Sequence, residues 1–216
     1  TLELGLGALP DTILGLLADH RDLGIHSGAI GDKVAELMEC GTITNARKSI
    51  DCGVTTAGVM MGSRRLHDFA DGNQAFRFRS SDYTHAAHVL ARIDNFVAIN
   101  SALEVDLTGQ VNSEVAGGRY VGAVGGAVDF GRGANRSRGG LPIIAFPSTA
   151  GGSSRIVSRL HGPVSMARSD AGIFVTEHGV ADLRGLPIAE RIPKMIAIAH
   201  PQYRELLERE ATQGRS

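Results

Sequence analysis

The 216-residue sequence has no tryptophan, few other aromatic residues and only two cysteines. Because aromatic residues make up 5% of the chain, a large core has to be built from Val, Ile, Leu, Ala and Met. An aliphatic core is typical of helices packed on a parallel sheet. Cys40 and Cys52 are too few for a disulfide framework, which favours the reducing cytoplasm. We expect both thiols to be small buried side chains.

The sequence also lacks a large net charge of either sign, since its 22 basic and 23 acidic residues give a net charge of −1. A balanced charge gives no general field for nucleic acid or an anionic membrane. No apolar run approaches the roughly 20 residues of a membrane helix, and no secretory signal opens the chain. The histidines stand at none of the usual metal-ligand spacings, so we expect no metal site. The sequence starts without Met in a glycine-rich turn, and we expect it to be part of a longer protein.

A stretch rich in glycine, residues 117–140, lies between two apolar runs at 96–107 and 141–148. Both runs are expected to be buried strands. Glycine-rich loops after strands present backbone N–H groups to anionic ligands in α/β proteins. Guanidinium groups in the same stretch suit phosphate; they belong to Arg119, Arg132, Arg136 and Arg138. The alternative is a solvated surface connector.

Apolar strands and amphipathic helices alternate along the rest of the chain. Expected strands cover 23–26, 55–61, 76–79, 155–160 and 171–176, with 76–79 at an edge. Expected helices cover 32–38, 64–70, 83–93, 189–198 and 203–210, and one more begins at Pro10. The pattern predicts a single α/β domain over residues 1–216, with a mainly parallel sheet flanked by helices.

Seven motifs occur in order over nearly the whole chain: GLGALPDTIL, GIHSGAIGD, INSALEVDLTGQVNSE, GAVGGAVDF, IIAFPSTAGGSSRIV, VTEHGVADLRG and IAHPQYREL. Together they resemble the C-terminal domain of the acetyl-CoA hydrolase and 4-hydroxybutyrate CoA-transferase family. The resemblance implies a CoA-transferase-like fold and activity on acyl-CoA thioesters, including acetate metabolism. It also implies that the N-terminal half of the full protein is absent from this chain.

In that family a glutamate attacks the acyl-CoA, and the resulting glutamyl-CoA thioester passes CoA to a carboxylate or is hydrolysed. The resemblance places this glutamate in a GIHSE-type segment, which here is Gly24-Ile25-His26-Ser27-Gly28. Gly28 therefore stands at the position of the nucleophile. A glycine cannot form the covalent adduct, so the family's transfer route is in doubt for this chain.

The other family positions match better. The resemblance implies a CoA-contacting turn at Gly5, Leu6, Gly7, Ala8 and Leu9, and a further CoA contact at Leu103. Gly125 and Gly126 match the loop that supplies an oxyanion-hole amide, which stabilises the charge on a thioester carbonyl under attack. His85 aligns with the site that binds the substrate carboxylate.

Several residues can replace the missing nucleophile. Glu114 is the best remaining carboxylate, as nucleophile or general base, although a solvated acid at a strand end explains it too. His26 can activate water, or be an ordinary strand-end histidine. Two further pairs carry the same ambiguity between an active-site and a structural role: Glu104 with Asp106, and Glu177 with His178.

The leading hypothesis is an acyl-CoA processing enzyme, a CoA-transferase or acyl-CoA hydrolase, acting on acyl-CoA and a small carboxylate. We expect coenzyme A as substrate, a missing N-terminal domain or partner subunit, and a homodimer in the cytoplasm. The second hypothesis is a non-catalytic CoA-binding or regulatory module that has lost its nucleophile. A weaker third is a sugar-phosphate or nucleotide-binding protein, against which stands the lack of GxGxxG or GxxxxGK[ST] after a strand.

Overall fold

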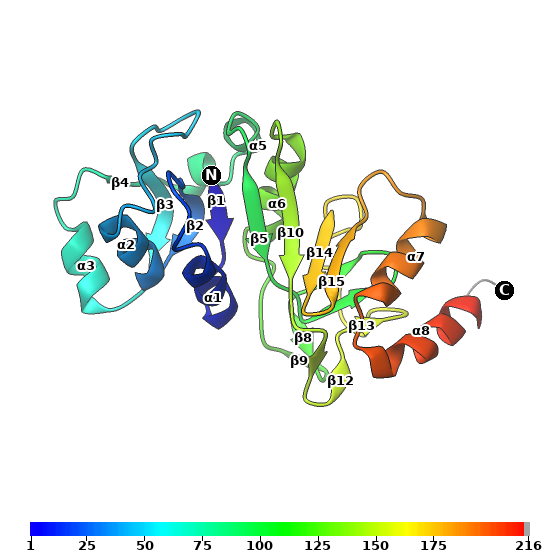
Figure 1. Ribbon diagram of the computed structural model, residues 1–216. Helices are drawn as coiled ribbons and strands as arrows, with labels where there is room; N and C mark the ends of the chain where they lie inside the picture. Colours follow the sequence, from blue (N-terminus) through cyan, green and yellow to red (C-terminus); the bar gives the residue numbers. More distant parts are fainter. Residues whose placement is uncertain (214–216) are drawn as a thin grey trace. The chain divides into compact units, whose positions relative to one another are not determined.

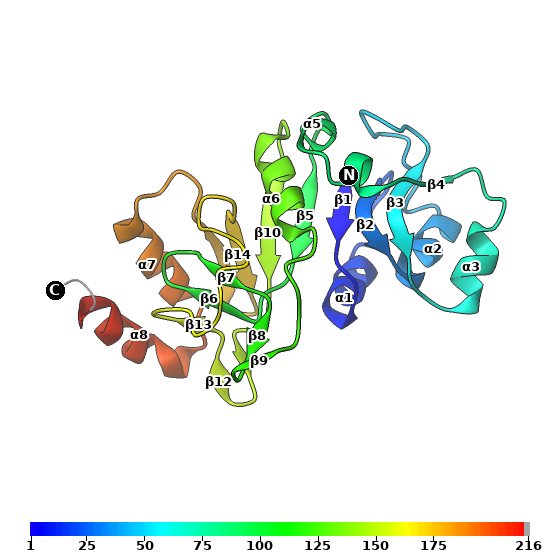
Figure 2. The same cartoon turned by 180° about the vertical axis from the view of Figure 1, so that it is seen from behind.

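The computed structural model describes residues 1–213, and their contacts separate into two compact units. Unit 1 comprises Thr1–Asn100 and Arg132–Leu141. Unit 2 comprises Ser101–Gly131 and the described residues from Pro142 onward. Figure 1 and the reverse view in Figure 2 show strands interleaved with helices in each unit.

Unit 1 is built on parallel strands. β1 (Leu2–Leu4) pairs with β5 (Val97–Asn100), and β3 (Thr55–Met60) pairs with β2 (His26–Ile30) and β4 (Phe76–Phe78). The helices are α1 (Ala8–Leu16), α2 (Asp32–Glu39), α3 (Arg64–Ala70), α4 (Ser81–Thr84) and α5 (Ala87–Leu90). Because β2 aligns with β3 from His26 opposite Thr56, the carboxyl ends of both strands lie at one edge.

Unit 2 contains a second parallel pair, β10 (Leu141–Ala145) with β14 (Ile173–Thr176), which β15 (Gly179–Asp182) extends antiparallel. A small sheet joins β6 (Glu104–Asp106) in parallel to β13 (Ile156–Val157) and antiparallel to β7 (Val111–Asn112). Two short hairpins are β8 (Val115–Ala116) with β9 (Arg119–Tyr120) and β11 (Thr149–Ala150) with β12 (Ser153–Ser154). The unit ends with α7 (Ile188–Ala197) and α8 (Pro201–Gln213), which lie next to each other in Figure 1.

The expected α/β fold with a mainly parallel sheet and flanking helices is confirmed. The core is aliphatic as composition predicts, and Phe96 and Phe174 are among its few aromatic members. In unit 2 one cluster of buried residues includes Val105, Ile156 and Met195. Burial of such side chains is the main favourable term in folding.

The expectation of a continuous loop over residues 117–140 is wrong, because Ala127–Arg136 form helix α6. Glycine inside this helix has a packing reason: a Cβ at Gly133 would lie 2.5 Å from Cβ of Leu90. Helix propensity alone counts each internal glycine as a penalty of about 1 kcal/mol. Close packing against α5 overrides that penalty.

Two other expected elements are divided. The run 96–107 contains β5 and β6, because Val105 donates its N–H to Arg155 O and so joins a different sheet. The helix expected over 83–93 is split into α4 and α5 by Ala86, whose backbone is extended (φ −66°, ψ 122°). The strand expected at 155–160 is limited to Ile156–Val157.

Both cysteines are exposed, so the expectation of buried thiols is wrong. Cys40 follows α2 and its Sγ donates to Glu36 O at 2.9 Å, while Cys52 Sγ donates to Ala46 O at 3.1 Å. Each thiol therefore caps a local backbone carbonyl. No helix among residues 1–213 is long and apolar enough to cross a membrane.

Candidate functional site

The backbone at the start of β2, just before Gly28, is held by hydrogen bonds with side chains of a neighbouring loop. Ile25 N donates to Asn45 Oδ1 at 2.9 Å, and Lys48 Nζ donates to Ile25 O at 2.8 Å. Burial lowers the pKa of Lys48 to about 8. Gly24 is required beside it, because a Cβ there would lie 2.5 Å from Cγ of Lys48. These contacts fix the backbone that leads to Gly28.

His26 and Gly28 share one face of β2, since side chains alternate along a strand. A Cβ placed on Gly58 of the neighbouring strand would lie 2.7 Å from Gly28 O and 3.6 Å from Thr84 Oγ1. His26 Nε2 lies 3.1 Å from Thr84 O. Position 28 therefore faces the end of α4.

His85, predicted at the substrate-carboxylate site, follows α4 directly. Its Nδ1 lies 2.8 Å from Thr84 Oγ1, the same hydroxyl that approaches Gly58. Unit 1 therefore brings His26, Gly28 and the α4 end that precedes His85 into one neighbourhood. The structure holds these predicted residues together although 57 positions separate Gly28 from His85 in the sequence.

The chemistry available at this neighbourhood is limited. Gly28 has no side chain, and His26 is fully buried. Burial, with the nearby Lys48 charge, lowers the pKa of His26 to about 4, so its imidazole is neutral at pH 7. Its Nδ1 is buried and accepts no hydrogen bond from residues 1–213. A base with a pKa of about 4 accepts a proton poorly at neutral pH.

The turn Gly5–Leu9 lies on the opposite face of β2. Ser27 Oγ donates to Leu4 O at 3.0 Å, and Gly5, Ser27 and Ala29 line one small cleft. Gly7 precedes α1 with a φ of +124°, which favours glycine, and the first N–H groups of that helix follow it. The exposed backbone here can meet the amide or phosphate groups of a ligand.

Unit 2 contains the remaining predicted residues. Leu103 lines a cleft of about 530 Å³, which we call the Leu103 cleft. Its lining includes Gly117 and Gly118 of the β8–β9 hairpin, Ser154 and Arg155. Glu104 lies at the rim of this cleft and contacts His161 twice. Its Oε2 accepts a hydrogen bond from the backbone N–H of His161 at 2.8 Å, and its Oε1 lies 2.6 Å from the ring nitrogen Nδ1 of His161. The carboxylate of Glu104 is therefore engaged in a structural contact with His161.

Glu114 is half-buried and tied to a neighbour. Its Oε1 accepts a hydrogen bond from Ser165 Oγ at 2.7 Å, and its backbone N–H donates to Asn112 Oδ1. The residue is therefore neither a fully solvated acid nor a free base. Asp106 is buried, and its carboxylate accepts hydrogen bonds from Thr108 and Gln110 as a turn cap.

Gly125 and Gly126 precede α6. Gly125 adopts a φ of +56°, and Gly126 O accepts from Phe130 N at 3.1 Å, as expected of the residue before a first helical turn. The N–H groups at such a terminus point along the axis without intrahelical partners. This geometry suits an oxyanion donor. Of the expected arginines, Arg138 pairs with Asp94, and Arg119 lies on the exposed β9 strand.

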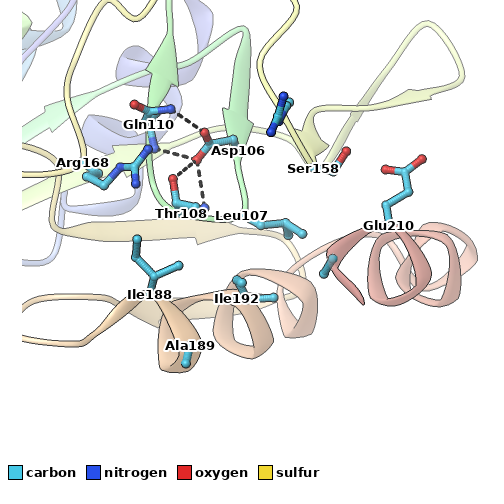
Figure 3. A pocket seen from close by; sticks show the side chains of 12 residues that line it. Asp106, Leu107, Thr108, Gln110, Ser158, Arg168, Ile188, Ala189, Ile192 and Glu210 are labelled. Carbon is cyan, nitrogen blue, oxygen red and sulfur yellow. Dashed lines mark hydrogen bonds between the residues drawn. The ribbon is translucent and has the colours of Figure 1, made fainter. Parts of the chain in front are cut away.

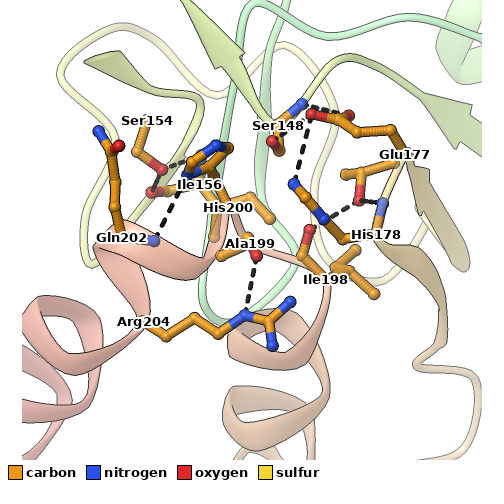
Figure 4. Close-up of polar contacts among 11 residues, drawn as sticks. Ser148, Ser154, Ile156, Glu177, His178, Ile198, Ala199, His200, Gln202 and Arg204 are labelled. Carbon is orange, nitrogen blue, oxygen red and sulfur yellow. Dashed lines mark hydrogen bonds and ion pairs between the residues drawn. The ribbon is translucent and has the colours of Figure 1, made fainter. Parts of the chain in front are cut away.

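Glu177 and Ser148 follow the carboxyl ends of the parallel strands β14 and β10, where open α/β sheets bind ligands. Figure 4 shows their contact: Glu177 Oε1 accepts from Ser148 Oγ at 2.5 Å and Oε2 from Ser148 N at 2.9 Å. Burial alone would raise the pKa of Glu177, but these hydrogen bonds, with one from its own N–H and the nearby His178, hold it below its usual range. His178 Nε2 lies 3.6 Å from Glu177 Oε1.

Glu3, a buried carboxyl on β1, is not indicated by any sequence pattern. Asn100 Nδ2 donates to Glu3 Oε2 at 2.9 Å, and burial raises the pKa of Glu3 to about 8. A single acid in a short apolar run gives no pattern from which such burial can be predicted. Among residues 1–213, no cluster of three His, Cys, Asp or Glu side chains is placed to hold a metal ion.

Residues 62–211 match the family model described as acetyl-CoA hydrolase/transferase C-terminal domain. The 4-hydroxybutyrate coenzyme A transferase of Clostridium kluyveri is 44% identical over 97% of this chain and 50% of its own length. The chain thus spans about half the length of the curated relatives it matches.

Solved structures agree with the sequence comparison. RipA from Yersinia pestis superposes with a TM-score of 0.92 at 40% identity, over 99% of this chain and 48% of that one. A 4-hydroxybutyrate CoA-transferase from Porphyromonas gingivalis gives a TM-score of 0.87 at 39% identity, over 99% of this chain and 51% of that one. Each of these superpositions includes both compact units of the chain.

Proposed function

Because this chain belongs to the acetyl-CoA hydrolase/transferase family, we propose that it supplies half of an acyl-CoA site and processes the thioester. The reaction is transfer of CoA between an acyl-CoA and a small carboxylate, or hydrolysis of the thioester. The observation that carries the proposal is the similarity to CoA-transferases over 97% of the chain, together with the family-model match over residues 62–211. A second domain or subunit supplies the other half, as the half-length coverage of relatives suggests.

We assign CoA binding to backbone groups at Gly5–Leu9 and to Leu103. The exposed glycine turn before α1 offers N–H groups and no bulky side chains. Leu103 contributes an apolar wall to a cleft of about 530 Å³. Gly126, at the start of α6, supplies an oxyanion donor, worth roughly 3 kcal/mol in a transition state.

Covalent catalysis at position 28 does not form part of this proposal, since glycine offers no nucleophile. If the thioester is hydrolysed, water forms the new C–O bond as the C–S bond breaks, and CoA leaves as thiolate that takes up the proton. Glu114 of unit 2 is the proposed base, after release of its hydrogen bond with Ser165. His85 is the proposed contact for an acceptor carboxylate.

One observation favours a second candidate, a non-catalytic CoA-binding module. The groups nominated to replace the nucleophile are all engaged or weak. His26 is buried with a pKa of about 4, Glu114 bonds Ser165, and Glu104 bonds His161. A fold that binds CoA without turnover would keep the glycine turns and need no such group.

The test uses the full-length protein that contains this chain, mixed with acetyl-CoA alone and with a small carboxylate. Thiol release or exchange of CoA supports the enzyme, whereas isothermal titration that shows CoA binding without turnover selects the module. Absence of both binding and turnover contradicts both candidates. Borohydride reduction followed by peptide mapping should label nothing in residues 23–33, and a labelled peptide there would refute the non-covalent assignment.

A further inference from the structure

Unit 2 has a second cavity, of about 540 Å³, which the proposed CoA chemistry does not use. Figure 3 shows it bounded on one side by the turn after β6 and on the other by α7 and α8. We call it the α7–α8 cavity. Its apolar lining includes Leu107, Ile188, Ala189 and Ile192. A volume of this size accommodates a small organic molecule.

The cavity lies at the carboxyl ends of the parallel strands β6 and β13. Asp106 ends β6, Ser158 follows β13, and both line the cavity. The Leu103 cleft is lined by Leu103 and Arg155, which precede the same two strands. The two cavities therefore occupy opposite ends of one strand pair. Crevices at the carboxyl ends of parallel strands are the usual ligand sites of open α/β sheets.

Two cations line the α7–α8 cavity. Within the described part of the chain, neither the Arg159 nor the Arg168 side chain forms an ion pair or hydrogen bond. Arg168 is half-buried, and its backbone carbonyl accepts from Arg191 Nη1 at 3.1 Å, which fixes the chain at this point. A guanidinium stays charged at every physiological pH. A partly buried, unpaired cation beside an apolar wall favours an anion with an apolar tail.

The acidic side chains that line the cavity determine how many carboxylates its ligand can carry. The carboxylate of Asp106 accepts four hydrogen bonds from Thr108 and Gln110, three at Oδ1 and one at Oδ2, and these donors partly offset its negative charge. Glu210, on α8, lies at the other side of the cavity, as Figure 3 shows. A second carboxylate on the ligand would meet this like charge at a cost.

We propose that the α7–α8 cavity binds a short aliphatic monocarboxylate. Its carboxylate pairs with Arg168, and its chain lies against Ile188 and Ile192. This site is separate from the proposed acyl-CoA chemistry and does not depend on it. A monocarboxylate is favoured over a dicarboxylate because Glu210 repels the second charge.

The experiment measures hexanoate binding to the full-length protein by titration calorimetry. Arg168→Gln should weaken hexanoate at least about tenfold, since a charge-assisted hydrogen bond is lost. The matched control is Arg209→Gln, an exposed arginine on α8 outside the cavity lining, which should bind hexanoate like the wild type. Ala189→Met, which fills the cavity without changing charge, should also weaken binding.

Two further measurements test where the ligand binds and whether the cavity prefers a monocarboxylate. Crystals of the full-length protein soaked in 6-bromohexanoate should show the bromine signal in the α7–α8 cavity. Adipate, the dicarboxylate of the same length, should bind at least about tenfold more weakly than hexanoate. Unchanged hexanoate affinity in both Arg168→Gln and Ala189→Met, or a bromine signal only elsewhere, would overturn the proposal. Loss of acyl-CoA turnover in these variants is not expected.

Discussion

Asn100 Nδ2 donates a hydrogen bond of 2.9 Å to Glu3 Oε2, and this carboxyl on β1 is buried. Its partner is neutral, so no opposite charge compensates the burial of a carboxylate. Burial is the dominant cause that raises the pKa of Glu3 to about 8. At neutral pH the folded protein therefore holds Glu3 mostly in its protonated form, whereas the unfolded chain ionises near its usual pKa of about 4.3.

This difference predicts that stability falls as pH rises between about 4.5 and 8, because folding then requires Glu3 to take up a proton. The slope from this group approaches about 1.4 kcal/mol per pH unit, and it disappears above the folded pKa. Glu3→Gln keeps the hydrogen-bonding shape without the charge. We expect a gain in stability at pH 8 and a flatter profile, measured by urea unfolding at several pH values.

The contrasting variant is Glu3→Ala, which removes the partner of Asn100 and leaves a cavity. It should destabilise the protein at pH 5, where Glu3→Gln should behave like the wild type. A Glu3→Gln protein with the same pH slope as the wild type would show that another group controls this stability.

Gly28→Glu tests whether the rest of the neighbourhood still supports covalent transfer. Since β2 and α4 keep position 28 beside the Thr84 and His85 segment, the introduced carboxylate should face that segment. We expect a gain of CoA-transferase activity in the full-length protein and a borohydride-labelled peptide covering residues 23–33. Gly28→Gln, which has the same size without a nucleophile, should gain neither.

Close packing at the β2–β3 edge leads to a stability prediction. A Cβ on Gly58 would lie 2.7 Å from Gly28 O, well inside van der Waals contact. We expect Gly58→Ala to destabilise unit 1 by about 1–3 kcal/mol, the usual cost of forcing extra volume into a packed site. Gly15→Ala is the control, because its added methyl group meets open space and alanine favours the α1 helix. Equal stability of the two variants by chemical unfolding would contradict the tight contact.

Sequence patterns sufficed for the fold where periodicity was strong. The buried run at β3, the amphipathic helix α2 and the edge strand β4 were all predictable from local residues. Helix α6 was not, because its Gly133 packs against Leu90, which is distant in sequence. Local propensity cannot register such a partner.

In the candidate site, too, some features could be predicted from the sequence and others could not. The family pattern indicates positions such as Gly28 and Gly126, and the strand–helix order explains why Gly28 faces the α4 end. What the sequence does not indicate is the state of each side chain. The bond from Ser165 to Glu114 joins residues 51 positions apart, and burial of Glu3 depends on Asn100, 97 positions away.

Ser148 contributes to the lowered pKa of Glu177 at the carboxyl ends of β10 and β14. Its hydroxyl and its backbone N–H both donate to the carboxylate, and together with the N–H of Glu177 itself and the nearby His178 they outweigh the effect of burial and lower the pKa of Glu177. Ser148→Ala removes one donor, so we expect the pKa of Glu177 to rise. A titration followed by NMR of ¹³C-labelled glutamate carboxyl groups measures the change. Ser154→Ala, a nearby serine that donates to Ile156 O instead, should leave the Glu177 pKa unchanged.

The oxyanion role proposed for Gly126 can be separated from its role in starting α6. Proline lacks an N–H group but is tolerated where a helix begins, so Gly126→Pro removes the donor while α6 can still form. Gly126→Ala keeps the donor. If the N–H stabilises the developing oxyanion, Gly126→Pro should lower kcat for thioester turnover by about 10²–10³-fold while Gly126→Ala stays near wild type. Matching circular dichroism spectra would verify the fold of both, and equal kcat values would place the oxyanion donor elsewhere.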